Sequence, residues 1–138
     1  MRVMSIDLGL VRTGIAISDE TMQFAFPDCV INEYNEDRLI EKIISKSKEL
    51  NAQKIICGLP KNMDGTQGER AEKCKKIGSI IQEKSGIEII FWDERLSTVA
   101  AYNLFNQSGT YGKKRKQNID SVAACVILEG YLNSLKNI

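Results

Sequence analysis

The sequence of 138 residues contains no histidine. This absence excludes nucleophile pairs of the Ser-His-Asp and Cys-His kinds, histidine-ligated zinc and imidazole as a general base. The chain has only two prolines, and no apolar run approaches the roughly 18 residues needed to cross a bilayer. Any chemistry must therefore rest on carboxylates, lysines, hydroxyls or a metal ion, and we expect no membrane partner.

Charge is nearly balanced, with 19 basic and 18 acidic residues and a net charge of +1. Binding of a nucleic acid would therefore depend on local basic patches rather than on bulk charge. The length and the 43% hydrophobic content are typical of one globular domain spanning residues 1–138. The four cysteines lack the spacing of a metal site or a disulfide framework, which predicts buried free thiols. The N-terminal residues lack a signal-peptide pattern, so we expect a cytoplasmic location.

Three apolar segments open the chain, with short connections between them. Val3–Ile6 and Gly14–Ser18 are short apolar runs, and Phe24–Ile31 is a third predicted strand. Pro27 places this third strand at a sheet edge or beside a bulge, because proline cannot donate a hydrogen bond to a neighbouring strand. Short connections between three consecutive strands predict an antiparallel meander.

Helical spacing then alternates with two more strands, predicted at Lys54–Cys57 and Ile87–Trp92. Asn35 is the predicted cap of one helix, Thr66 begins a capping-box pattern for the next, and Ser97 or Thr98 caps a short third helix. The second helix places Ala71, Cys74, Ile77, Gly78 and Ile81 on one side. The final helix carries an apolar stripe of Ala123, Ala124, Ile127, Leu128, Tyr131, Leu132 and Leu135. A meander followed by αβαβα predicts an α/β fold with a mixed five-stranded sheet and helices on both faces, the arrangement of ribonuclease-H-like domains.

Acidic residues lie at the ends of three different elements. Asp7 ends the first strand, Asp93 and Glu94 follow the fifth, and Asp120 lies near the start of the final helix. Asp120 is four residues before Ala124 on the apolar stripe, which places it on the side facing the sheet. Taken singly, Asp7 also fits a turn residue and Asp120 a partner of the helix dipole. The local sequence does not decide between Asp93 and Glu94.

If the three elements bring their carboxylates together, the cluster would be a cation site. Carboxylates about 5 Å apart repel by roughly 3 kcal/mol per pair at an effective dielectric constant near 20. Such a cluster persists by taking up protons or by binding cations. Oxygen ligands without histidine select hard ions, which predicts Mg²⁺ or Mn²⁺ as the cofactor. Because two such ions can activate water and stabilise the leaving oxygen in phosphodiester cleavage, the predicted chemistry is that of a metal-dependent nuclease.

A basic segment lies just before the third acid. Its four adjacent cations are Lys113, Lys114, Arg115 and Lys116. Such a run is commonly a solvated loop, but acids that repel a phosphate backbone would need nearby cations to bring it in. Arg12, in the turn after the first strand, either clamps a phosphate or neutralises Asp7. Arg12 and the basic segment are the predicted nucleic-acid contacts.

Four motifs resemble segments of the YqgF (RuvX-like) family. They are DLGLVRTGIA from Asp7, GLPKNMDGT from Gly58, DERLST from Asp93, and the Ile119-Asp120 and Ala123-Ala124 pairs of the final helix. In this order they cover nearly the whole chain, and the resemblance implies a ribonuclease-H-like fold related to Holliday-junction resolvases. It also implies a nuclease that matures the 5′ end of pre-16S rRNA in the bacterial cytoplasm. By the same analogy Asp7, Glu94 and Asp120 hold the metal ions, and the choice of Glu94 over Asp93 rests on that comparison.

Alternative functions from other classes stay open on the sequence. A resolvase acting on structured DNA would need a symmetric dimer to cut paired strands, and no feature of the sequence distinguishes a monomer from a homodimer. A sugar-kinase-like ATPase half-domain also has Asp-x-Gly after a strand, but a single short domain disfavours it. A factor that binds an rRNA precursor without cutting it predicts that Asp7→Asn leaves function intact.

Overall fold

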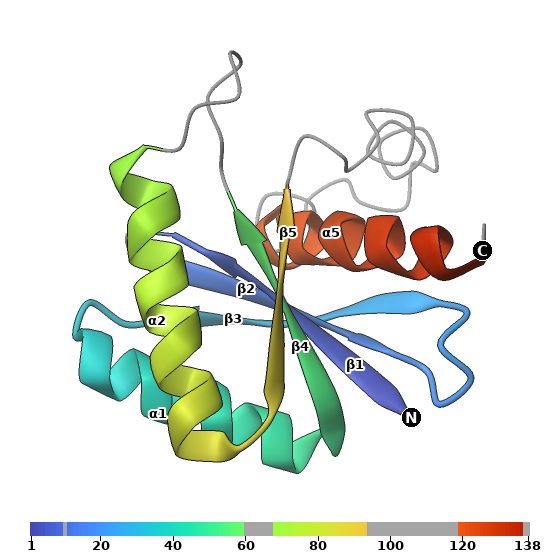
Figure 1. Cartoon of the computed structure of the whole chain (residues 1–138), viewed down its shortest axis with the longest axis horizontal. Coiled ribbons are helices and arrows are strands. Elements are labelled where there is room, and N and C mark those ends of the chain that lie inside the picture. Colours follow the sequence, from blue (N-terminus) through green and yellow to red (C-terminus); the bar gives the residue numbers. More distant parts are fainter. Residues whose placement is uncertain (10, 60–67, 94–118, 137–138) are drawn as a thin grey trace.

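The computed structural model describes every residue except residue 10 and the ranges 60–67, 94–118 and 137–138 (Figure 1). The elements in chain order are β1 (Arg2–Leu8), β2 (Arg12–Ser18), β3 (Ala25–Asn32), α1 (Glu36–Glu49), β4 (Ala52–Leu59), α2 (Glu69–Ser85), β5 (Glu88–Asp93) and α5 (Ile119–Lys136). Within the described residues the strands form one five-stranded sheet in the order β3-β2-β1-β4-β5. Neighbours are antiparallel from β1 to β3 and parallel from β1 through β4 to β5. The predicted mixed α/β sheet is confirmed.

The edge strand β3 has the irregularity that its proline predicted. Cys29 lies opposite Ile15 and Pro27 lies opposite Ala16, so Asp28 is an additional residue in β3. An additional residue of this kind is a β-bulge, and together with the edge position it accommodates a residue without a backbone N–H. The antiparallel meander and the placement of Pro27 are therefore confirmed.

The sheet separates two apolar cores, and alternate residues of its central strand face them. Met4 and Ile6 of β1 belong to the core beneath α1 and α2, whereas Val3 belongs to the core beneath α5. Figure 1 shows α1 and α2 on one side of the sheet and α5 on the other. The period of two along a strand produces this division, and the predicted covering of both faces is confirmed.

The first two helices begin differently. The side chain of Asn35 caps α1 as predicted, because its Oδ1 accepts a hydrogen bond of 3.0 Å from the backbone N–H of Arg38. The predicted start of α2 at Thr66 is wrong, since the N-cap is Gly68, whose carbonyl accepts from the N–H groups of Ala71 and Glu72. Glycine has no side chain that could accept a hydrogen bond from the first turn, so α2 begins with hydrogen bonds to the backbone carbonyl of its cap alone. The apolar face predicted for α2, from Ala71 to Ile81, is buried.

The final helix, α5, is buried over more of its circumference than the predicted stripe. Its stripe residues from Ala124 to Leu132 are buried, but Leu135 is 37% exposed. The additional buried residues are Val122, Cys125 and Val126. The helix predicted after Ser97 or Thr98 lies outside the described residues. Among the helices that are described, none combines the length and apolar character needed to cross a membrane.

The cysteines have the environment that their spacing predicted. Cys57, Cys74 and Cys125 are buried, Cys29 is partly buried, and all four thiols are free. Burial raises the pKa of the Cys125 thiol to about 12 and that of Cys29 to about 11. These two thiols are therefore protonated at neutral pH and act as small apolar side chains.

Candidate active site

The carboxyl ends of three strands lie along one edge of the sheet. β1 and β4 are parallel with Ile6 opposite Cys57, and β4 and β5 are parallel with Leu59 opposite Asp93. Asp7, Leu59 and Asp93 therefore stand near the same edge, the edge at which parallel α/β sheets commonly place their sites.

Asp7 lies on the α5 face of this edge and is partly exposed. It follows Ser5 by two residues, and alternation places both on the same face of β1. Its partner in the antiparallel ladder is Gly14 of β2, which has no side chain to cover the carboxylate. Arg12 is exposed at the start of β2 and shares the face of Gly14, two residues nearer the sheet edge. The predicted neighbourhood of Asp7 and Arg12 on one face is thus present.

The direction of α5 brings its first turn to the same edge. In the second turn of the helix, the carbonyl of Ala124 accepts a hydrogen bond of 2.6 Å from the hydroxyl of Ser5. At the far end, the Lys136 ammonium donates to the carbonyl of Gln23, in the hairpin beyond the start of β1 (Figure 1). Because α5 runs antiparallel to β1, its N-terminal turn lies toward the carboxyl end of β1. The backbone of Asp120 is in that turn, next to Ile119, which begins the helix.

The remaining predicted site residues are only partly within the described chain. Glu94 and the basic segment from Lys113 to Lys116 lie outside it, as does the side chain of Asp120. Asp93 is the last residue of β5, and alternation places it with Phe91 on the face covered by α2. Among the described side chains there is no group of three metal-ligating residues. The three-carboxylate metal site therefore stays a prediction.

A cavity on the opposite face of β1 was not predicted. It lies at the carboxyl end of the strand, between α1 and α2, with an apolar floor that includes Leu8, Leu39 and Ile77. Its rim includes Tyr34, in the turn before α1, and Arg70, in the first turn of α2. Sequence periodicity could not indicate this cavity, because its rim residues come from a turn and from the first turn of a helix that are far apart in the sequence.

The thiol of Cys74 also lines this cavity and lies close to the charges of the sheet edge. A hydrogen bond with Cys57 lowers the pKa of Cys74, and the cations Arg70 and Lys73 act in the same direction. Burial of the thiol and the charge of Asp7 oppose this shift. The Asp7 carboxylate and the cations of α2 thus act on one thiol, from opposite sides of β1.

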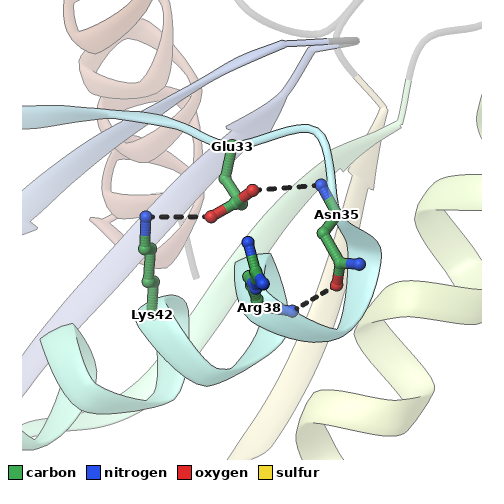
Figure 2. Close-up of polar contacts among 4 residues, drawn as sticks. All are labelled: Glu33, Asn35, Arg38 and Lys42. Carbon is green, nitrogen blue, oxygen red and sulfur yellow. Dashed lines mark hydrogen bonds and ion pairs between the residues drawn. The ribbon is translucent and has the colours of Figure 1, made fainter.

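The turn between β3 and α1 is held by a set of polar contacts (Figure 2). The carboxylate of Glu33 accepts a 3.2 Å hydrogen bond from the backbone N–H of Asn35 and forms a 3.0 Å ion pair with Lys42. The contact with Lys42 lowers the pKa of Glu33. The backbone N–H of Glu33 donates to the carbonyl of Val11, 2.9 Å away. This contact fixes the turn to the connection between β1 and β2.

A family profile described as RuvX: Holliday junction resolvase matches residues 1–134 of the chain. The chain belongs to the RuvX family. A Bacillus cytotoxicus relative, named as a candidate pre-16S rRNA nuclease, is 43% identical over 137 residues, which cover 97% of this chain and 99% of the relative. An Agathobacter rectalis relative with the same name is 38% identical and covers 99% of this chain and 98% of its own length. The family predicted from the four motifs is therefore confirmed.

Solved structures agree with this RuvX assignment at the level of the fold. T. thermophilus RuvC in complex with a Holliday junction substrate superposes with a TM-score of 0.69, covering 99% of this chain and 96% of its own, at 13% sequence identity. At that identity the similarity establishes the fold alone. The RuvX chain has the ribonuclease-H-like fold that the resemblance implied.

Proposed function

We propose that this RuvX-family protein is a metal-dependent endonuclease that hydrolyses phosphodiester bonds at the 5′ end of pre-16S rRNA in the bacterial cytoplasm. One observation carries the proposal: the partly exposed Asp7 and the first turn of α5, which contains Asp120, lie at the same edge of the sheet. The names of relatives that match nearly the whole chain support the substrate. Precursor rRNA is thus the proposed partner.

The donor set suits Mg²⁺ or Mn²⁺. Asp7 presents carboxylate oxygens opposite a glycine, and oxygen donors without histidine are the ligands that these hard ions prefer. When bound, such ions activate water and stabilise the leaving oxygen of a phosphodiester. Asp7, Glu94 and Asp120 would hold them and set their positions relative to the scissile phosphate.

The orientation of β5 supports Glu94 rather than Asp93 as the ligand from this strand. Asp93 shares the α2 face with Phe91, whereas Asp7 is on the α5 face. A carboxylate on the α2 face points away from Asp7, so the adjacent acid is the better partner. This physical reason is independent of the motif similarity.

Cations would guide the RNA to the acids. Arg12 is exposed on the face of Asp7, and we assign it a contact with a phosphate of the RNA. We assign the same role to the four cations of the segment from Lys113 to Lys116, because this segment precedes α5, whose first turn lies at this edge. Neutralising the phosphate backbone beside a cluster of acids requires such positive charge.

Single substitutions of the acids test the nuclease proposal. We expect Asp7→Asn, Glu94→Gln and Asp120→Asn each to reduce Mn²⁺-dependent cleavage of an rRNA precursor by at least about a hundredfold, because each removes a charged metal ligand. Affinity for RNA should change little. The measurement is single-turnover cleavage together with a binding titration, and Glu41→Gln, an exposed acid on α1, is the matched control. Full cleavage in the presence of EDTA, or by all three variants, would disprove the metal mechanism.

A second candidate function is cleavage of four-way DNA junctions, which the family description favours. Symmetric cleavage of a junction requires two active sites related by a two-fold axis, and therefore a dimer. Assaying a precursor rRNA and a four-way junction side by side, with the molecular mass measured in the same buffer, separates the two. Preferential cutting of the junction by a dimer would replace the RNA proposal.

A further inference from the structure

Tyr34 is an aromatic residue held in an ordered turn with its ring in solvent. Its side chain is 82% exposed. The residues on either side are fixed, because Glu33 donates its N–H to Val11 and Asn35 caps α1 (Figure 2). A ring of this size would gain favourable free energy if its apolar surface were removed from water, and Tyr34 does not make this gain within the folded chain. Because the backbone is already ordered, stacking a ligand on this ring would cost little further conformational entropy.

Two cations share the cavity with this ring. Arg70 and Lys73 are exposed and lie three residues apart on α2, so they occupy the same helix face. The guanidinium of Arg70 also donates a hydrogen bond of 3.4 Å to the carbonyl of Leu8, which ties it to the end of β1. Within the described part of the chain, neither cation forms an ion pair with a carboxylate.

The acids around the cavity are already paired. Glu33 forms its ion pair with Lys42, and Glu36 forms one of 3.7 Å with Lys76. Neither of these lysines lines the cavity. Among the described residues that line the cavity, the charge that remains for a ligand is therefore the positive charge of Arg70 and Lys73, and charge complementarity favours a phosphate.

We propose that Tyr34, Arg70 and Lys73 form a subsite for one unpaired nucleotide of the RNA substrate, at the sheet edge that carries the proposed cleavage site but on the opposite face. The base stacks on Tyr34, and its phosphate contacts the two cations. Only an unpaired base has a face free for an aromatic side chain, so the subsite selects single-stranded RNA. Leu8 and Gly9 line the cavity and follow Asp7 directly, so an RNA strand that passes around this end of β1 can reach both the subsite and the proposed cleavage site. The inference rests on the proposed nuclease function.

The ring is tested by binding of a fluorescein-labelled single-stranded RNA to the full chain in EDTA. We expect Tyr34→Ser to weaken binding about tenfold, within the range measured for base stacking on aromatic residues. Tyr34→Phe should retain wild-type affinity, because it retains the ring. Phe24→Ser is the matched control, since Phe24 is 61% exposed in the hairpin at the opposite end of the sheet. The melting temperature of the Tyr34 variants should equal that of the wild type.

The cations and the stacked base have their own readouts. Lys73→Gln should reduce the slope of log affinity against log salt by about 0.7, as expected for one lost phosphate contact to a single strand. Lys84→Gln, at the other end of α2, should leave the slope unchanged. An RNA with one abasic nucleotide at the subsite should bind the wild type about tenfold more weakly but lose nothing further with Tyr34→Ser.

The outcomes separate this subsite from the nuclease proposal. If the wild type cleaves RNA while Tyr34→Ser binds and cleaves as the wild type does, the subsite is wrong and the nuclease stands. If the wild type neither binds nor cleaves RNA, both proposals fail. If Tyr34→Ser weakened the binding of single-stranded DNA of the same sequence but not the binding of RNA, the assignment of RNA as the ligand would be overturned.

Discussion

Asp7 and Asp19 are acidic residues at opposite ends of the first hairpin, with different surroundings. Asp7 is partly exposed and lies opposite Gly14, which has no side chain. The carboxylate of Asp19 instead accepts hydrogen bonds from its own turn, at 2.9 Å from the N–H groups of Gln23 and Phe24, and a further one from Thr21. The proposed role of Asp7 is to bind a metal ion, whereas the contacts of Asp19 stabilise its own turn.

Asp19 makes the stability of the hairpin depend on pH. The hydrogen bond from Thr21 is the main reason that the pKa of Asp19 falls from 3.8 to about 2. Because the folded pKa lies below the unfolded value, the contribution of Asp19 is fully present above about pH 5 and is lost as the pH falls through about 2. We expect Asp19→Asn to be less stable than the wild type at pH 6, with a difference that shrinks as the pH falls to about 2 and vanishes below it. Urea unfolding across this range measures the difference, and a difference independent of pH would contradict the assignment.

At the scale of elements, the packing of α2 on β5 depends on the absence of a side chain. A Cβ atom at Gly78 would lie 2.7 Å from Cε1 of Phe91 and 3.3 Å from Cγ2 of Ile89. The first distance is shorter than real Cβ contacts allow, and the second is tighter than most of them. Only glycine at this position therefore lets the helix come this close to the strand without displacing the Phe91 ring.

We expect Gly78→Ala to destabilise the protein by about 1 kcal/mol. Overpacking costs about 1–3 kcal/mol, and the better helix propensity of alanine returns about 1 kcal/mol. Ser79→Ala, exposed on the same helix, is the control and should be neutral or slightly stabilising. Urea unfolding gives both values. If the Phe91 ring causes the clash, Phe91→Leu should restore part of the unfolding free energy that Gly78→Ala loses. Purely additive losses of unfolding free energy in the double variant would contradict this explanation.

Secondary structure could be predicted where the signal is periodic, whereas short capping motifs gave mixed results: Asn35 caps α1 as predicted, but the pattern at Thr66 does not begin α2. The apolar face of α2 followed from helical spacing, since burial repeats with the helix period from Ala71 to Ile81. The capping-box pattern at Thr66 was misleading, because four residues match such a motif easily and Gly68 begins the helix through its own carbonyl. The exposed Tyr34 had no signal, since one aromatic outside a repeating pattern has no predicted environment.

At the scale of the whole molecule, the sequence named the candidate acids but did not show how the backbone of Asp120 comes to the edge that carries Asp7. The direction of α5 depends on the contact between Ser5 and Ala124, which are 119 residues apart. No local pattern encodes a contact of that range. The motif similarity could associate Asp7 with Asp120, whereas the physical reason, an antiparallel helix packed across β1, required the structure.

The two cores share one sheet, which predicts that they unfold together. Leu128 of α5 is fully buried in one core, and Ile40 of α1 is fully buried in the other. We expect Leu128→Ala to lower the free energy of unfolding by about 2–5 kcal/mol, and Leu135→Ala, at a 37% exposed position, to lower it by less than about 1 kcal/mol.

Amide hydrogen exchange tests whether this loss spreads across the sheet. If residues 1–138 fold as one domain, the amide of Ile40 should lose as much protection in Leu128→Ala as the amides of α5 do, because opening either core exposes the strands that both need. Faster exchange confined to α5, with Ile40 as protected as in the wild type, would show that α5 docks as a separate unit. In that case the edge that carries Asp7 would form without the helix that carries Asp120, and the active site would depend on a docking step.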